Sequence, residues 1–219
     1  MEQRKIQGLN EGTILIVETI RFLTDPANKD AILLIIAGGS CSGKSLLALM
    51  VEENLKKVGL PASIIGLDDY YKNTDKPEFP HNSSGRAIFD LPDSFLRREF
   101  RQDIKRLLSG SNIQGPLYDK KTHQRSTTRS RFLKANPVII AEGLFAIKFL
   151  SDLRTENVLP VFVEADLDLR FKRRIKRDTD SLHDSEAEAR RFIEERVEPY
   201  YEKWVKPQIK KADIIVVNN

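Results

Sequence analysis

The sequence contains one cysteine, no long apolar run and only a small excess of charge. Cys41 is the single cysteine among 219 residues, which excludes an internal disulfide and favours a reducing compartment. The longest apolar run, residues 31–37, is far too short to span a bilayer. The N-terminal residues are charged and lack a small-residue cleavage site, so we expect no signal peptide, no membrane partner and a cytoplasmic location.

The charge balance and the composition narrow the class of protein further. A net charge of +4, from 36 basic and 32 acidic residues, suits an anionic small ligand without requiring nucleic acid. Hydrophobic residues make up 40% of the chain and charged residues 31%, as in ordinary soluble domains. A chain of this length favours one domain with excursions over two domains.

Short apolar runs rich in isoleucine and valine recur along the chain. They occupy residues 31–37, 62–67, 138–141, 160–164 and 213–217. The runs lack polar alternation, as expected for strands that are buried on both faces of a parallel sheet. Helical patterns separate them, so we predict an α/β fold with a doubly wound, five-stranded parallel sheet. In such a sheet the ligand lies beyond the carboxyl ends of the strands.

A glycine-rich loop follows the first run and precedes a helical pattern. Residues 38–45 place two glycines with four residues between them and end in Lys44 and Ser45, which is the phosphate-binding loop pattern. Backbone N–H groups of such a loop surround a polyphosphate, the lysine reaches its outer phosphates and the hydroxyl binds Mg²⁺. We therefore expect ATP or GTP as phosphoryl donor, together with Mg²⁺. The predicted nucleotide-binding residues are Gly38, Gly39, Ser40, Cys41, Ser42, Gly43, Lys44, Ser45 and Leu46.

Carboxylates follow several of the other predicted strands. Asp68 and Asp69 come after the second run, and one of them could accept a proton from an attacking hydroxyl or hold Mg²⁺ through water. Glu142 follows the third run and could bind metal through water or hold a substrate hydroxyl, with Gly143 permitting close approach. Asp166 follows the fourth run. The alternative for the first two sites is a carboxylate that only caps a helix.

Residues 1–30 precede the first predicted strand. Ile14, Val17, Ile20 and Phe22 have helical spacing and end before Pro26, so we expect a helix packed on the sheet without a catalytic role. A strand over residues 13–20 is the alternative, because that segment carries β-branched residues.

Residues 70–136 have a looser pattern. A proline- and glycine-rich loop covers residues 73–85, and a helix is expected to start at residues 90–93, with helical spacing up to Gly110. A polar stretch over residues 118–131 follows, and such long irregular segments usually bind substrate or form a lid. Within it, His123 could donate to a substrate oxygen and Arg125 could bind an anion. A solvated surface loop is the alternative.

Residues 170–177 form a strongly basic run whose two apolar members, Phe171 and Ile175, are four residues apart. This spacing favours a helix with one packed edge. Its arginines could stabilise charge on a phosphoryl group in transfer. Nucleic-acid binding and a solvated basic face are the alternatives, and the modest net charge argues against nucleic acid.

Taken in order, these motifs resemble the uridine kinase branch of the uridine kinase/phosphoribulokinase family. The matching segments are residues 38–45, 68–72, 89–95, 118–125, 142–144, 166–178 and 212–215. The resemblance implies a P-loop kinase domain over residues 31–219, with a substrate-binding excursion at about 70–136 and a lid at about 170–195. It also implies that pyrimidine nucleosides are phosphorylated with ATP or GTP, commonly by homo-oligomers.

The resemblance further implies roles for individual residues. Asp68 would be the general base for a ribose 5′-hydroxyl, and Asp90 would hold ribose hydroxyls. Together with Arg125 from the polar stretch, the substrate-binding residues would be Asp68, Tyr71, Asp90, Tyr118, His123 and Arg125. The catalytic cations would be Lys44, Arg174 and Arg177, and the Mg²⁺ shell would involve Ser45, Glu142 and Asp68.

Two departures from the family pattern leave the acceptor open. No Arg-Gly-Arg element follows Arg177, although Arg190 and Arg191 could replace it. Lys120 stands where uridine kinases often place an aromatic that stacks on the pyrimidine. The alternatives are therefore another acceptor (a different nucleoside, a sugar phosphate, pantothenate or glycerate) and a nucleotide-binding regulator without turnover.

Overall fold

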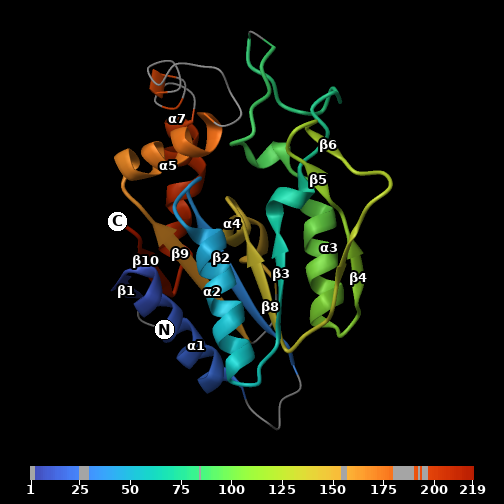
Figure 1. Cartoon of the computed structure of the whole chain (residues 1–219). Helices are drawn as coiled ribbons and strands as arrows, with labels where there is room; N and C mark the ends of the chain where they lie inside the picture. Colours follow the sequence, from blue (N-terminus) through green and yellow to red (C-terminus); the bar gives the residue numbers. More distant parts are fainter. Residues whose placement is uncertain are drawn as a thin grey trace.

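The fold is built on a six-stranded sheet in which every neighbouring pair of strands is parallel (Figure 1). The computed structural model describes residues 3–24, 30–83, 85–153, 157–179, 190–191, 193 and 197–219. The strands of the sheet are β1 (Arg4–Gln7), β2 (Ile32–Gly38), β3 (Ala62–Gly66), β8 (Val138–Glu142), β9 (Val158–Glu164) and β10 (Ile214–Val217). Their spatial order is β1-β10-β9-β2-β8-β3, so β2 lies in the interior of the sheet.

Five strands coincide with the predicted apolar runs, whereas the expectation of only five strands was wrong. The sixth, β1, pairs with β10 at the edge of the sheet, with Arg4 opposite Ile214 and Gln7 opposite Val217. Three of its four residues are exposed, so it carries no apolar run that a sequence pattern could reveal. What makes this segment a strand is its backbone pairing with β10, which its side chains do not reveal.

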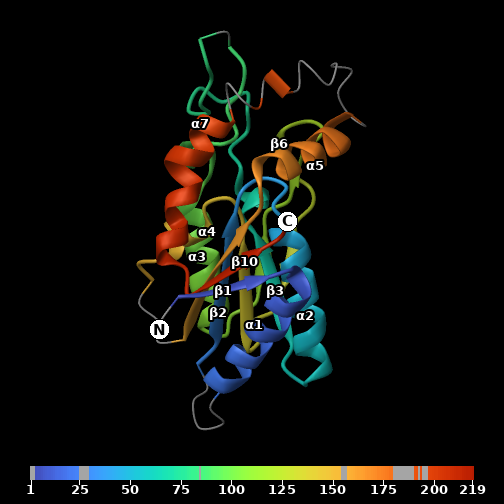
Figure 2. The same cartoon turned by 90° about the vertical axis from the view of Figure 1, so that its left-hand side faces the viewer.

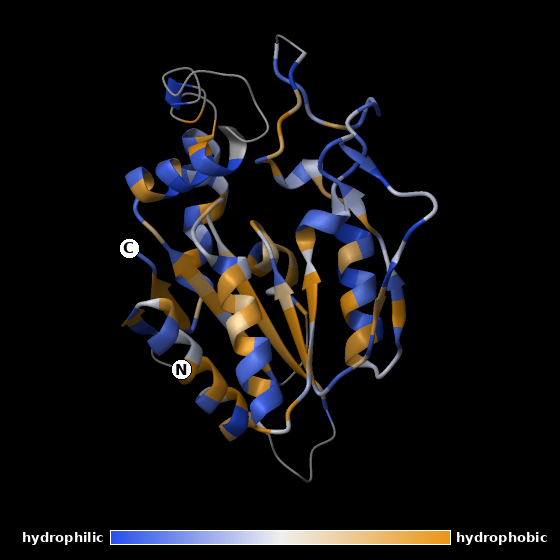
Figure 3. Ribbon diagram, in the orientation of Figure 1, coloured by the Kyte–Doolittle hydropathy of each residue, from blue (hydrophilic) through white to orange (hydrophobic). Residues whose placement is uncertain are grey.

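Helices cover both faces of the sheet (Figure 2). Leu34 and Ile36 of β2 pack with α1 (Leu9–Leu23) and α2 (Lys44–Lys57). Leu33 and Ile35 pack on the opposite face with α3 (Arg97–Leu108), α4 (Ala146–Leu150) and the π-helical turn η3 (Tyr201–Val205). Because both faces of β2 are buried, its sequence is apolar throughout, as the hydropathy colouring shows (Figure 3). This arrangement is the predicted doubly wound sheet.

The helix expected before the first predicted strand is α1, although only part of its expected apolar face is buried. Ile16, Val17 and Ile20 are buried, whereas Ile14 is 59% exposed and Phe22 is 90% exposed. Helix α1 approaches the sheet closely at Gly12, where a Cβ atom would lie only 2.8 Å from the methyl groups of Val216. The N-terminal segment thus adds β1 to the edge of the sheet and adds α1 to the layer of helices on one face.

The excursion after β3 begins at the carboxyl ends of the strands and extends beyond them, whereas its helix α3 and strand β4 run back alongside the sheet (Figure 1). It contains the 3-10 turns η1 (Leu67–Tyr70) and η2 (Pro92–Ser94), followed by α3. Two short antiparallel pairs follow, β4 (Ile113–Gly115) with β7 (Arg131–Leu133) and β5 (Tyr118–Asp119) with β6 (Gln124–Arg125).

The helix that we expected to begin at residues 90–93 begins instead at Arg97. Leu91 and Phe95 both have extended backbone, and Phe95 forms a β-bridge with Tyr71. This bridge ties the approach to α3 back to the residues that follow η1, which delays the start of the helix.

The basic run forms the greater part of α5 (Leu167–Thr179), which stands at the same end of the sheet as the excursion (Figure 1). Arg170 anchors this helix: its guanidinium is 2.8 Å from Glu198 Oε1 and lies over the ring of Tyr201 at 3.9 Å. Glu198 belongs to α7 (Glu198–Tyr200), which leads through η3 into the 3-10 turn η4 (Lys206–Lys211) and β10. In the described part of the chain, every helix is too short or too polar to cross a membrane.

The packing of α1 predicts a sharp contrast between two isoleucines of the same helix. We expect Ile20→Ala to lower the free energy of unfolding by about 2–5 kcal/mol, because Ile20 is completely buried and its loss leaves a cavity. Ile14→Ala is the matched control and should change it by less than about 0.5 kcal/mol. Urea unfolding measures both. Equal effects would contradict the packing of this helix on the sheet.

Candidate active site

The loop between β2 and α2 has a backbone that requires glycine at two positions. Gly38 has φ of 156° and Gly43 has φ of 101°. A Cβ atom on Gly38 would lie 2.5 Å from the carbonyl oxygen of Val163, and one on Gly43 would collide with the side chain of Asn218. Larger residues are therefore excluded from both positions, and the backbone N–H groups of such a glycine loop can surround a chain of phosphates.

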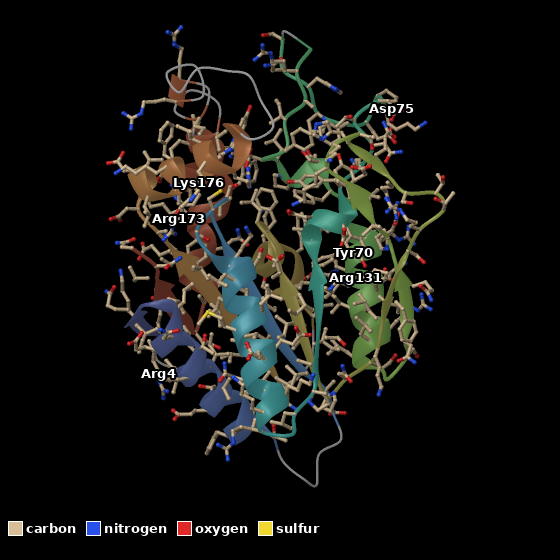
Figure 4. The ribbon with its side chains drawn as sticks, viewed as in Figure 1. Arg4, Tyr70, Asp75, Arg131, Arg173 and Lys176 are labelled. Carbon is tan, nitrogen blue, oxygen red and sulfur yellow. The ribbon has the colours of Figure 1, made fainter. Side chains whose placement is uncertain are left out.

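Two side chains from outside this loop donate hydrogen bonds to its carbonyl oxygens. Asn218 Nδ2 donates to the carbonyl oxygen of Ser42 at 2.7 Å. Arg173, labelled in Figure 4, donates from α5 to the carbonyl oxygens of Cys41 at 3.4 Å and Asn218 at 3.3 Å. Since the peptide unit is planar, anchoring a carbonyl also fixes the direction of the following N–H. Sequence reasoning assigned no such role to Asn218, which is 176 positions from Ser42.

Ser45 and Glu142 lie side by side, as predicted for a shared metal site. Ser45, in the first turn of α2, donates its hydroxyl to Glu142 Oε2 at 3.2 Å. Burial raises the pKa of the Glu142 carboxyl, and Lys44 opposes that effect. A hydroxyl and a carboxylate are hard oxygen donors of the kind that Mg²⁺ prefers, so these two residues fit that ion.

Asp68 faces the phosphate loop and is bound by a lysine. It lies in η1, directly after β3, and its Oδ2 is 2.7 Å from Lys120 Nζ. Burial disfavours the charged form, but Lys120, Lys44 and Arg177 outweigh it and hold the pKa of Asp68 below its usual value. The carboxylate is therefore ionised at neutral pH, which a proton acceptor requires. A role for Asp68 in holding Mg²⁺ with Ser45 stays a prediction, because the contact that Asp68 makes is to Lys120.

Asp69 points into the excursion and supports it. The N–H of Tyr118 donates to Asp69 Oδ1 at 3.3 Å, and Arg131 Nη1 is 4.0 Å from Oδ2. Arg131 is labelled in Figure 4 beside Tyr70, the residue that follows Asp69. The two neighbouring carboxylates thus have different surroundings, and only Asp68 is held among the cations of the phosphate loop and α5.

The residues predicted to bind the acceptor form an aromatic and charged cluster. The ring of Tyr71 lies 5.3 Å from that of Tyr118, and His123 contacts the cluster through Phe89 at 5.0 Å. The hydroxyl of Tyr118 is buried and has no hydrogen-bond partner within the described residues. Burial also raises the pKa of Tyr118 to about 12, so the phenol remains a donor. A buried donor without a partner is a candidate for binding a ligand.

Asp90 connects this cluster to α5. Its Oδ2 is 3.9 Å from Arg174 Nη2, and both side chains are largely buried. Burial raises the pKa of Asp90, whereas Arg174, Arg177 and Lys44 oppose that effect. Arg125, by contrast, forms an ion pair with Glu99 of α3 at 2.9 Å. Its guanidinium is thus paired with a carboxylate of the excursion itself.

The lid predicted at about residues 170–195 stays a prediction, because residues 180–189, 192 and 194–196 lie outside the described residues. Arg190 is 3.6 Å from Asp168 and lies over the ring of Phe171 at 4.6 Å, so it packs against α5. That Arg190 and Arg191 replace the absent Arg-Gly-Arg element remains a prediction. Arg177 acts electrostatically on both Asp68 and Asp90.

Two half-sites therefore meet at the carboxyl ends of the strands. One consists of the glycine loop with Lys44, Ser45 and Glu142. The other consists of the aromatic cluster with Asp68 and Asp90. A phosphate-binding loop beside an ionised carboxylate is suited to transferring a phosphoryl group to a hydroxyl.

Comparisons with known proteins agree with this chemistry. The model of the phosphoribulokinase / uridine kinase family matches residues 33–218. A uridine kinase from Deinococcus deserti is 35% identical over 181 residues, covering 83% of this chain and 84% of that protein. A uridine kinase from Halobacterium salinarum is 34% identical over 184 residues, covering 83% and 77%.

Solved structures share the fold at low sequence identity. A possible uridine kinase from Bacillus stearothermophilus superposes with a TM-score of 0.62 at 20% identity, covering 95% of this chain and 98% of that one. A D-glycerate 3-kinase from Cryptococcus neoformans gives a TM-score of 0.64 at 16% identity, covering 92% and 89%. The sheet order, the phosphate loop and the family match lead to one conclusion: this chain belongs to the phosphoribulokinase/uridine kinase family of P-loop kinases and is a phosphotransferase that acts on a hydroxyl group.

Proposed function

We propose that this chain transfers the γ-phosphoryl group of ATP or GTP to the ribose 5′-hydroxyl of a pyrimidine nucleoside. The observation that carries the proposal is the position of Asp68, which is ionised and lies between the phosphate loop and the aromatic cluster around Tyr71. The relatives named uridine kinase support a nucleoside as the acceptor.

The donor would bind through the loop and the cations around it. Backbone N–H groups of residues 38–45 and the ammonium of Lys44 would hold the phosphates. Ser45 and Glu142 would hold Mg²⁺, which supplies positive charge to the phosphates as the transferred group becomes more negative. Arg174 and Arg177 would bring further positive charge from α5. These contacts act mainly by positioning the donor and by stabilising charge.

The acceptor would bind in the aromatic cluster. Asp90 would accept hydrogen bonds from the ribose hydroxyls, and Tyr71 and Tyr118 would flank the nucleoside, with His123 at its edge. Asp68 would accept the proton of the 5′-hydroxyl as its oxygen bonds to the γ-phosphorus. The bond from that phosphorus to the β,γ-bridging oxygen would break, which releases the nucleoside diphosphate.

Removing the charge of Asp68 tests the reaction. We expect Asp68→Asn to lower kcat by between about 10²- and 10⁴-fold, because the amide cannot accept the proton, with little change in KM for ATP. The measurement is release of nucleoside diphosphate with uridine or cytidine as acceptor. Asp75→Asn, an exposed aspartate of the excursion that is labelled in Figure 4, is the matched control and should keep the wild-type rate. An unchanged kcat in Asp68→Asn would refute the assigned role.

The same assay with several acceptors decides between the substrates. We expect the highest kcat/KM for uridine or cytidine among a panel that also contains purine nucleosides, a sugar phosphate, pantothenate and glycerate. If another compound has the highest kcat/KM, that compound would be the acceptor in place of a pyrimidine nucleoside. No product with any of them would favour a regulator that binds the nucleotide without turnover.

Asp90 predicts a separate effect on acceptor binding. We expect Asp90→Asn to raise KM for the nucleoside by about 10- to 100-fold and to leave KM for ATP within about twofold, because hydrogen bonds to a charged group contribute about 1.5–3 kcal/mol. Asp93→Asn, an exposed aspartate nearby, is the control. Initial rates at varied concentrations of each substrate separate the two constants. A rise in KM for ATP alone would place Asp90 on the donor side.

A further inference from the structure

Lys120 brings an ammonium group to the carboxylate proposed as the base. It follows β5 at the turn of the β5–β6 hairpin, and its Nζ lies 2.7 Å from Asp68 Oδ2. The two residues are 52 positions apart and belong to different segments of the excursion. Lys120 also interacts electrostatically with Arg177 and Glu142, so its charge lies where the two half-sites meet.

This ion pair is poorly suited to stabilising the fold. The side chain of Lys120 is 68% exposed and that of Asp68 is 42% exposed. Ion pairs exposed to this extent contribute little, because solvent screens the charges and two side chains lose conformational freedom. A function in the reaction accounts for the contact better than a contribution to stability does.

The charges of the acceptor side are balanced pairwise. Lys120 neutralises Asp68, and Arg174 neutralises Asp90. Lys44 and Arg177 remain close to Asp68 and would meet the phosphates of the donor. Asp68 and Asp90 are therefore each paired with a cation, which suits a neutral acceptor.

We propose that Lys120 is a positioning residue for Asp68, which holds the carboxylate in the orientation that receives the acceptor hydroxyl. This inference rests on the proposed function. With Oδ2 bound to the ammonium, the acceptor hydroxyl is received by Oδ1. A nucleoside held by Asp90 and the aromatic cluster reaches that atom with high effective concentration, whereas a water molecule has no such anchors.

The arrangement therefore favours phosphoryl transfer over hydrolysis of the donor. If water takes the place of the acceptor, its oxygen bonds to the γ-phosphorus, its proton passes to Asp68, and nucleoside diphosphate and phosphate are released. A carboxylate that turns freely can activate water in more orientations. The ratio of hydrolysis to transfer thus reports how firmly Asp68 is held.

The test uses Lys120→Ala and Lys120→Arg in the full chain. We expect Lys120→Ala to lower kcat for transfer by about 10- to 100-fold, to leave KM for ATP unchanged and to raise the hydrolysis-to-transfer ratio at least about tenfold. Lys120→Arg keeps a cation at this position and should restore most of both values. Lys121→Ala, the exposed neighbour in the same turn, is the control and should match the wild type.

A double-mutant cycle with Asp68→Asn shows whether Lys120 acts through Asp68. In the Asp68→Asn background, Lys120→Ala should change kcat for transfer by less than about twofold. A full effect in that background would overturn the proposal, as would an unchanged ratio in Lys120→Ala. Faster transfer in Lys120→Tyr with an unchanged ratio would also overturn it, because the position would then serve only for stacking. Failure of the proposed function is distinguished by Asp68→Asn alone, which would then leave transfer unchanged.

Discussion

The parallel pairing of β2 with β8 on one side and β9 on the other determines where the chemistry of this protein lies. In this register Ile36 is opposite Glu142, and Gly38 is opposite Val163. The carboxylate at the end of β8 therefore lies beside the phosphate loop, where Ser45 in the first turn of α2 donates to it. A shift of one residue would turn the side chain of Glu142 to the other face of the sheet. The pairing of Ser45 with Glu142, which we propose would hold Mg²⁺, is thus a consequence of strand register.

One helix contacts both half-sites. On α5, Arg173 donates to the carbonyl oxygen of Cys41 in the phosphate loop, and the next residue, Arg174, is paired with Asp90 on the acceptor side. Arg170 fixes the base of the same helix against Glu198. Neighbouring residues of α5 therefore link the phosphate loop to the aromatic cluster.

The sequence revealed those features that depend on local pattern and on strand ends. Five strands, the phosphate loop and the positions of Asp68 and Glu142 follow from apolar runs and from what comes directly after them. Strand β1 was missed because its pairing with β10 is long-range and its side chains are mostly exposed. The contact of Asn218 with Ser42 was missed for the same reason. Side-chain pairings between distant segments depend on the completed fold, and one sequence carries no local signal for them.

Lys120 is the strongest physical argument against a nucleoside as the acceptor. Stacking on an aromatic contributes about 1–3 kcal/mol per base, and a lysine cannot reproduce that contact. Other aromatic rings are present in the site, however. The ring centroids of Tyr71 and Tyr118 lie 5.3 Å apart, and the ring of Phe89 lies beside His123. These rings can still flank a planar base. In the proposed function, the ammonium on Asp68 affects a different quantity, the orientation of the proton acceptor, and it does not replace stacking on the nucleobase.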